Sequence, residues 1–172
     1  MKSWQASVLS KNKEGLLSNA QLKALLKAGC DKDARFRLQA TGFSMSPFIR
    51  NGDVVTVATR STIRFGDVIA LAHPHSDRVL IHRIVGLNTT HVLTRGDNAG
   101  TPDGWIPYRR VLGRVEQIEK PDGRKVWGLG PERIMIAVLT RTGLLPSVGK
   151  PLWNVCKRLI GRHCDAASHR ST

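Results

Sequence analysis

Acidic side chains, aromatic side chains and long apolar runs are all scarce in this chain, and each shortage limits what the protein can be. Only 13 residues are Asp or Glu against 27 Lys or Arg, and aromatic residues make up 5% of the chain. No run of about 18 apolar residues occurs, so the sequence predicts no membrane-spanning helix. The lysine-bearing N-terminus is followed by no apolar segment of the secretory kind. We therefore expect a cytoplasmic protein or one attached peripherally to a membrane.

Cysteine and metal-ligand patterns are also missing. Cys30, Cys156 and Cys164 are odd in number, and their spacing matches no zinc or redox motif. We interpret them as reduced thiols, which argues against a disulfide-built secreted domain. His73 and His75 lie close together, but no neighbouring cysteine or carboxylate completes a ligand set. The sequence predicts neither a metal nor a cofactor.

The excess of positive charge, +14 at pH 7, predicts attraction to a polyanion such as nucleic acid or an anionic membrane surface. The basic residues are scattered along the chain rather than clustered. No zinc-finger spacing, RNA-recognition signature or homeodomain-like helix occurs. We therefore do not expect DNA as a partner, and the oligomeric state is left open.

Alternation of apolar and polar residues begins at Arg35 and predicts a mainly β fold. Gly-Asp and Asn-Gly turns separate the alternating runs, as in antiparallel sheets. A Pro-Asp-Gly-Arg turn at 121–124 further predicts a hairpin into a short last strand. The predicted strands are 36–40, 54–58, 67–72, 79–87, 91–94, 111–118 and 125–127.

Helical patterns flank this β region and suggest a three-part chain. Residues 1–34 form an N-terminal extension with a short amphipathic helix over 19–28. Residues 35–130 form the β domain. Residues 131–172 form a basic tail with predicted helices over 131–140 and 151–160. This tail can pack on the sheet or lie on an anionic membrane surface, as basic amphipathic helices do.

Ser44 is the first candidate catalytic residue. It lies in the segment Gly-Phe-Ser-Met-Ser-Pro at 42–47, between a predicted strand and an Asn-Gly-Asp turn at 51–53. A serine on such a bend exposes its hydroxyl and leaves a backbone N–H nearby, and acyl transfer needs both. Serines also occupy turns for purely conformational reasons, so Ser44 alone is a weak signal.

His82 offers the base that a serine nucleophile needs. It lies in the middle of the apolar run 79–85 and shares a strand face with Leu80 and Ile84, while Arg83 points to the other face. A free imidazole titrates near pH 6.5, so it can accept a proton at neutral pH. The competing interpretation is a core histidine bonded to a backbone carbonyl.

Two aspartates, Asp97 and Asp103, are candidates for the carboxylate that orients the imidazole. Asp97 belongs to a Gly-Asp-Asn sequence and Asp103 to a Pro-Asp-Gly sequence. Both sequences are also natural turns. The residues alone do not choose between the two carboxylates.

Taken in order, these motifs resemble the signal peptidase I family. The series runs from about Leu38 to Ile118: Gly-x-Ser-Met-x-Pro, Gly-Asp-x-Val-x-Val, Gly-Asp-Val-Ile, His-Arg-Ile-Val, Gly-Asp-Asn with an Asp six residues on, and Val-Leu-Gly-Arg-Val. A histidine before Arg83 is similar to the archaeal and endoplasmic-reticulum type rather than to the lysine type. The resemblance implies the coiled β fold of the signal peptidase and LexA-like clan.

The resemblance also implies roles for the candidate residues. Ser44 is the nucleophile, His82 the base, Asp103 the supporting carboxylate and Asp97 a second acidic position. The Ser44 N–H is an expected oxyanion donor. Signal peptidases often carry a serine at the place of Gly42, so Thr41 becomes the candidate for a replacement donor.

The function implied is a serine endopeptidase that cleaves an extended peptide, such as a precursor or leader peptide. Signal peptidases carry a spanning segment before the serine motif, which this sequence lacks. A glycine at position 42 resembles the LexA-type repressor peptidases, so a self-cleaving DNA-binding regulator is one alternative. A catalytically idle β module that binds peptides or membranes is the other.

Overall fold

The computed structural model describes residues 5–8, 21, 24, 28, 33–59, 61–73, 78–124 and 126–145. Alternating apolar residues in these ranges form strands, and the fold is mainly β, as the sequence predicted. The strands are β1 (Gln5–Val8), β2 (Arg35–Thr41), β3 (Val54–Ala58), β4 (Val68–Ala72), β5 (Val79–Leu87), β6 (His91–Arg95), β7 (Gly104–Pro107) and β8 (Val111–Glu119). A 3-10 turn, η1 (Tyr108–Arg110), and one helix, α2 (Arg133–Thr142), complete the described elements.

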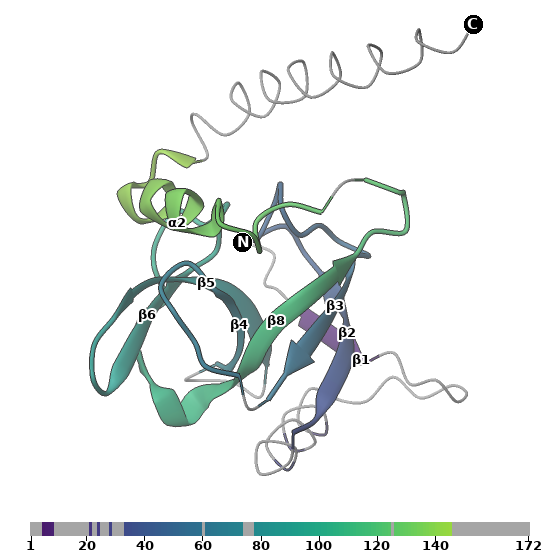
Figure 1. Ribbon diagram of the computed structural model, residues 1–172, viewed down its shortest axis with the longest axis horizontal. Helices are drawn as coiled ribbons and strands as arrows, with labels where there is room; N and C mark the ends of the chain where they lie inside the picture. Colours follow the sequence, from purple (N-terminus) through teal and green to yellow (C-terminus); the bar gives the residue numbers. More distant parts are fainter. Residues whose placement is uncertain are drawn as a thin grey trace, which may run out of the picture.

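The strands form one antiparallel sheet in the order β1-β2-β3-β8-β4-β5-β6-β7. The long strand β8 joins the two halves, since it pairs with β3 on one side and β4 on the other. Its register shifts against both partners, between Thr56 and Val57 in β3 and between Ala70 and Leu71 in β4. Such bulges bend a strand and increase its twist. The sheet therefore curls around itself, with β8 crossing the front of the molecule (Figure 1).

The core fills the inside of this curl. Every residue of β4 is buried, and so is every residue of β5 except Leu87. Strands that are covered on both faces carry apolar runs rather than alternation, which is the pattern of β4 and, apart from His82 and Arg83, of β5. The loop between β2 and β3 (residues 42–53, the Ser44 loop) also contributes, because the side chains of Met45 and Ile49 are fully buried. The loop is thereby anchored in the core.

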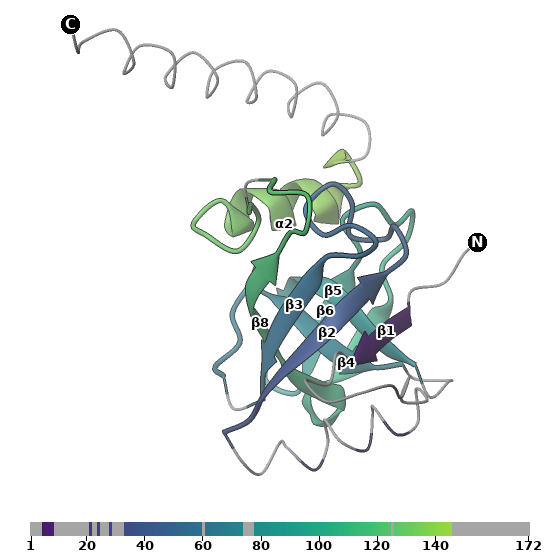
Figure 2. The same cartoon turned by 90° about the vertical axis from the view of Figure 1, so that its right-hand side faces the viewer.

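Helix α2 covers one end of the sheet and lies against β5 (Figures 1 and 2). Its inward face is formed by Ile136, Ala137 and Thr140, which are buried, whereas Ile134 and Met135 are exposed. Across the described part of the chain, no helix is both long and apolar enough to cross a bilayer.

Most predicted elements agree with the structure within one or two residues, but three points differ. The sequence did not predict β1 or β7. The predicted strand 125–127 is wrong, since Val126 and Trp127 lie outside any strand. Of the helix predicted over 19–28, residues 21, 24 and 28 are described and all are helical. The helix predicted over 151–160 lies outside the described residues.

Candidate active site

The loop that follows β2 presents Ser44. Strand β2 ends at Thr41, and Gly42 then takes a positive φ of 103°, a backbone conformation that other residues rarely adopt. The loop folds back on itself through a hydrogen bond from the Ser46 N–H to the Phe43 carbonyl, 3.1 Å long. Ser44 is half-buried, whereas its neighbour Phe43 is 61% exposed. The nucleophile candidate thus lies between the buried anchor of the loop and its exposed rim.

His82 lies in β5 beside this loop. Its side chain is buried, and Nε2 lies 3.0 Å from Ser44 Oγ. The two residues are 38 positions apart in the sequence and meet because the sheet curls β5 toward the end of β2. The distance is that of a normal hydrogen bond.

Asp103 completes a row of three side chains. Its Oδ2 lies 2.6 Å from His82 Nδ1 and accepts a second hydrogen bond, 2.8 Å long, from the Thr94 hydroxyl. A carboxylate only accepts hydrogen bonds, so Nδ1 of a neutral His82 carries its proton. Nε2 is then free to accept the proton of the Ser44 hydroxyl.

The pairing of β6 with β7 holds Asp103 in this position. Thr94 faces Gly104 across the two strands, and the Asp103 N–H donates to the Thr94 carbonyl over 2.8 Å. Sequence reasoning missed both Thr94 and β7. The only available signal was an apolar–polar alternation in 91–94, which places Thr94 on a definite face without naming its partner.

Gly96 packs directly against Ser44 and His82. A Cβ added at this position would lie 2.7 Å from the Ser44 carbonyl oxygen and 3.0 Å from His82 Nε2. Asn98, two residues further on, contacts the same loop, since its N–H donates to the Ser44 carbonyl over 2.7 Å. The Gly-Asp-Asn sequence therefore does more than turn the chain: it forms one wall of the site. The sequence had suggested a turn or a supporting carboxylate at Asp97, and it gave no role to Gly96 or Asn98.

Three hydrogen-bond donors at Ser44 and in the few residues before it have no partner in the described part of the chain. Within the described ranges, the N–H groups of Phe43 and Ser44 donate to no acceptor. The hydroxyl oxygen of Thr41 is buried and likewise has no partner there. Buried polar groups are normally satisfied, so the unpaired Thr41 hydroxyl is free to bind a ligand atom or a water. These groups are available to a negatively charged oxygen.

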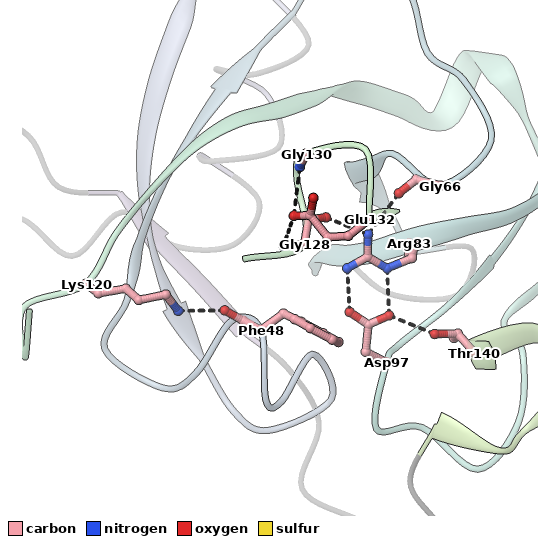
Figure 3. Close-up of polar contacts among 9 residues, drawn as sticks. All are labelled: Phe48, Gly66, Arg83, Asp97, Lys120, Gly128, Gly130, Glu132 and Thr140. Atoms are coloured by element: carbon pink, nitrogen blue, oxygen red, sulfur yellow. Dashed lines mark hydrogen bonds and ion pairs between the residues drawn. The ribbon is translucent and has the colours of Figure 1, made fainter. Parts of the chain in front are cut away.

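Asp97 has a different set of partners from Asp103. Both of its oxygens bind the Arg83 guanidinium, with Nε–Oδ1 and Nη2–Oδ2 distances of 2.8 Å (Figure 3). The Thr140 hydroxyl of α2 donates to Oδ1 over 3.0 Å. Neither side chain of the Arg83–Asp97 pair is exposed at all. The structure brings Asp103, and not Asp97, to His82.

The Arg83 guanidinium also joins three other segments. Its Nη1 donates to the carbonyls of Gly66 and Gly128, at 2.9 and 2.8 Å, and its carbon lies 5.6 Å from the Phe48 ring centroid. Phe48 belongs to the Ser44 loop. The buried ion pair thus connects the loop, β5 and the start of α2 on the side of the strand opposite His82.

Glu132 fixes the chain just before α2. Its Oε1 accepts hydrogen bonds from the N–H groups of Gly128 and Gly130, at 2.8 and 3.1 Å (Figure 3). Burial alone raises the pKa of Glu132, but these backbone donors and the nearby Arg83 charge outweigh it. The net result is a pKa below the ordinary value of 4.5.

A second buried ion pair holds the far end of the Ser44 loop. Lys120 Nζ donates to the Phe48 carbonyl over 2.6 Å and lies 3.1 Å from Asp53 Oδ2. Burial lowers the pKa of Lys120, and the Asp53 carboxylate opposes that shift. Asp53 also accepts from the Arg50 N–H over 2.8 Å. The loop is therefore held by the Asn98 hydrogen bond at Ser44 and by the Lys120–Asp53 pair at its other end.

Comparison with known proteins places the chain in a family. The model of the peptidase S24-like family matches residues 6–115, which span every strand of the sheet except the end of β8 and the first residue of β1. The comparison with curated proteins finds no match. The matched segment contains the Ser44, His82 and Asp103 row described above. The chain belongs to the peptidase S24-like family, within the clan of signal-peptidase- and LexA-like serine peptidases.

Proposed function

We propose that this protein is a serine endopeptidase in which Ser44 is the nucleophile, His82 the general base and Asp103 the group that orients His82. The observation that carries the proposal is the continuous row of hydrogen bonds, 2.6 Å from Asp103 to His82 and 3.0 Å from His82 to Ser44. Family membership supports serine-type peptidase activity. In its finer form the proposal is an activity like that of signal peptidase I, on a precursor or leader peptide.

The reaction proceeds through an acyl-enzyme. Ser44 Oγ attacks the carbonyl carbon of the scissile bond while its proton moves to His82 Nε2. The tetrahedral intermediate collapses, the C–N bond breaks, and His82 returns the proton to the leaving amine. A water molecule then attacks the ester with the help of His82, which releases the acid product and restores the Ser44 hydroxyl.

The free donors beside Ser44 supply the stabilisation that this reaction needs. The intermediate carries a negative oxygen, which the unpaired N–H groups of Phe43 and Ser44 can bind. The unpaired Thr41 hydroxyl is a third donor, in place of the serine that signal peptidases carry where this chain has Gly42. Removal of one such donor costs about 2.7–4 kcal/mol of transition-state stabilisation in other enzymes.

The test is cleavage of a pool of synthetic peptides of mixed sequence, read by mass spectrometry. We expect discrete products with the wild type and none with Ser44→Ala. Ser46→Ala is the matched control, since Ser46 lies in the same loop and its hydroxyl contacts none of the three residues of the row. Cleavage that survives in Ser44→Ala would contradict the proposal.

A self-cleaving regulator of the LexA type is the second candidate, and the position of β1 favours it. This strand pairs with β2, which leads into Ser44, so the chain's own N-terminal segment lies beside the nucleophile's strand. Purified protein incubated alone should then lose a fragment at a rate that does not depend on protein concentration. Unchanged intact mass, together with no salt-dependent binding to duplex DNA, would exclude this candidate.

A further inference from the structure

Strand β1 occupies the outer edge of β2, and β2 runs directly toward Ser44. The pairing is antiparallel, with Gln5 facing Thr41, Ala6 facing Ala40 and Val8 facing Leu38. Thr41 precedes Ser44 by three residues. β1 also comes close to β5, the strand that carries His82. In Figure 2, β1 is the purple strand that lies beside β2 in front of the other half of the sheet.

The other edge of β2 is already taken. The Ala40 N–H donates to the Asp53 carbonyl over 2.7 Å, and the Ala40 carbonyl accepts from the Gly52 N–H over 2.8 Å. Antiparallel ladders alternate, so the N–H and C=O groups of Gln39 and Thr41 point the opposite way, toward β1. Those groups are the backbone partners that β2 can offer to an added strand.

An extended peptide that adds a strand to β2 beside Ser44 would use this same edge. Peptides bind exposed sheet edges by adding a strand, with backbone hydrogen bonds for affinity and side-chain pockets for specificity. β2 is the strand that ends at the nucleophile, and β3 covers its far side along Arg35–Gln39. A peptide bound at the β1 edge would lie between the strand that leads to Ser44 and the strand that carries His82.

We infer that β1 is an internal occupant of the peptide-binding edge and that an external peptide must displace it from β2 to be cleaved at Ser44. The inference rests on the proposed endopeptidase function. Displacement is feasible because β1 has only four residues and lies at the margin of the sheet, where local opening costs the least free energy. The occupied form is closed to peptide, and the apparent affinity for peptide is reduced by the fraction of molecules in which β1 stays paired.

A pair of proline substitutions in the full chain tests this. Ser7 faces Gln39, so by the alternation of the ladder its N–H points to β2. Ser7→Pro removes that donor and should release β1. Ala6→Pro is the matched control, because Ala6 faces Ala40 and its N–H points away from β2. Loss of one backbone hydrogen bond should raise kcat/KM for a peptide substrate roughly two- to tenfold in Ser7→Pro relative to Ala6→Pro.

The opposite test locks β1 in place. Ala6 and Ala40 form a non-hydrogen-bonded pair, in which Cα atoms lie about 4.5 Å apart, within the range that a disulfide spans. The variant Ala6→Cys/Ala40→Cys should lose peptide cleavage when oxidised and recover it when reduced. Ala6→Cys alone, treated in the same way, controls for the three native cysteines. Hydrogen exchange at the amides of Gln39 and Thr41, faster in Ser7→Pro than in Ala6→Pro, gives a readout besides activity.

The outcomes separate the two levels of the proposal. Cleavage that requires Ser44 but proceeds equally in Ser7→Pro, in Ala6→Pro and in the oxidised double variant would overturn the role of β1 and leave the peptidase intact. Absence of Ser44-dependent cleavage in the wild type and in Ser7→Pro would instead overturn the proposed function. If the double variant does not fold, the comparison of the two proline variants still decides.

Discussion

The backbone of Gly96 lies against His82 so closely that a single added carbon would come within 3.0 Å of Nε2. The same carbon would lie 2.7 Å from the Ser44 carbonyl oxygen. Real Cβ atoms essentially never approach another atom to 2.7 Å, and 3.0 Å is also unusually tight, so at least one of the partners would have to move. Both neighbours belong to the hydrogen-bonded row, so we expect the movement to disturb the contact between Ser44 Oγ and His82 Nε2.

The first prediction therefore concerns Gly96→Ala. Displacement of reacting groups by about 1 Å costs roughly 100-fold in rate, and we expect a loss of that size in kcat/KM. Gly100→Ala is the matched control from the same segment, since a Cβ there meets nothing within 4 Å. Peptide cleavage assays on the two variants measure the difference. Equal rates would show that the site accommodates the methyl group and would contradict the prediction.

The second prediction tests whether Asp103 orients the His82 imidazole or only stabilises the fold. Asp103→Asn keeps the shape of the side chain but removes the carboxylate that holds His82 Nδ1–H, so His82 can adopt the wrong tautomer. We expect kcat to fall roughly 10⁴-fold, by comparison with other serine peptidases. The melting temperature should change little, because asparagine keeps the size of the side chain and Asp103 lies just before β7, outside the strand. A variant with normal kcat would remove Asp103 from the mechanism.

The third prediction concerns the other aspartate. Asp97→Asn leaves the Arg83 guanidinium buried without its counter-charge, and breaking a fully buried ion pair costs about 3–5 kcal/mol. We expect a marked loss in the free energy of unfolding, measured by urea denaturation. A loss of activity without a loss of stability would assign Asp97 to the chemistry instead. We thus expect Asp103→Asn to lower activity with little effect on stability, and Asp97→Asn to lower stability.

The fourth prediction concerns the part of the pH dependence of stability that the Glu132 carboxyl group causes. Its pKa in the folded protein lies below the ordinary 4.5, so its carboxylate stabilises the fold above that value. This contribution is lost as the pH falls from about 4.5 through the lower folded pKa. Glu132→Gln should be less stable than the wild type at pH 7 and should lose less stability between about pH 5 and pH 3. Urea unfolding at several pH values measures this, and parallel profiles for the two proteins would contradict it.

The sequence predicted most of the sheet because the relevant information is local. Residues 54–58 and 79–87 carry apolar runs, with an Asn-Gly-Asp turn at 51–53 before the first and a Leu-Asn-Thr turn at 87–89 after the second, and the structure forms strands there. β7 was missed because Gly104 and Pro107 disfavour strands, yet pairing with β6 places them in one. The strand expected at 125–127 is absent at Val126 and Trp127, although the turn before them looked typical of a hairpin.

At the site, too, the sequence identified residues in local motifs but not the contacts between residues that are distant in the sequence. The order of the motifs pointed to Ser44 and His82, and the structure brings them together. The choice between Asp97 and Asp103 depends on contacts across the sheet, since both aspartates follow turn-forming residues. The functions of Thr94 and Gly96 were invisible for the same reason: each depends on a neighbour that is distant in the sequence.

The adjacency of His82 and Arg83 has a consequence for how this scaffold can diversify. Because successive residues of a strand face opposite sides, one peptide bond separates the imidazole of the site from the guanidinium of the buried ion pair. The chemistry at position 82 can therefore change while position 83 continues to hold the Ser44 loop and α2 together. A single strand then accommodates a different side chain at the position of the proposed base, since the Arg83 contacts lie on its opposite face.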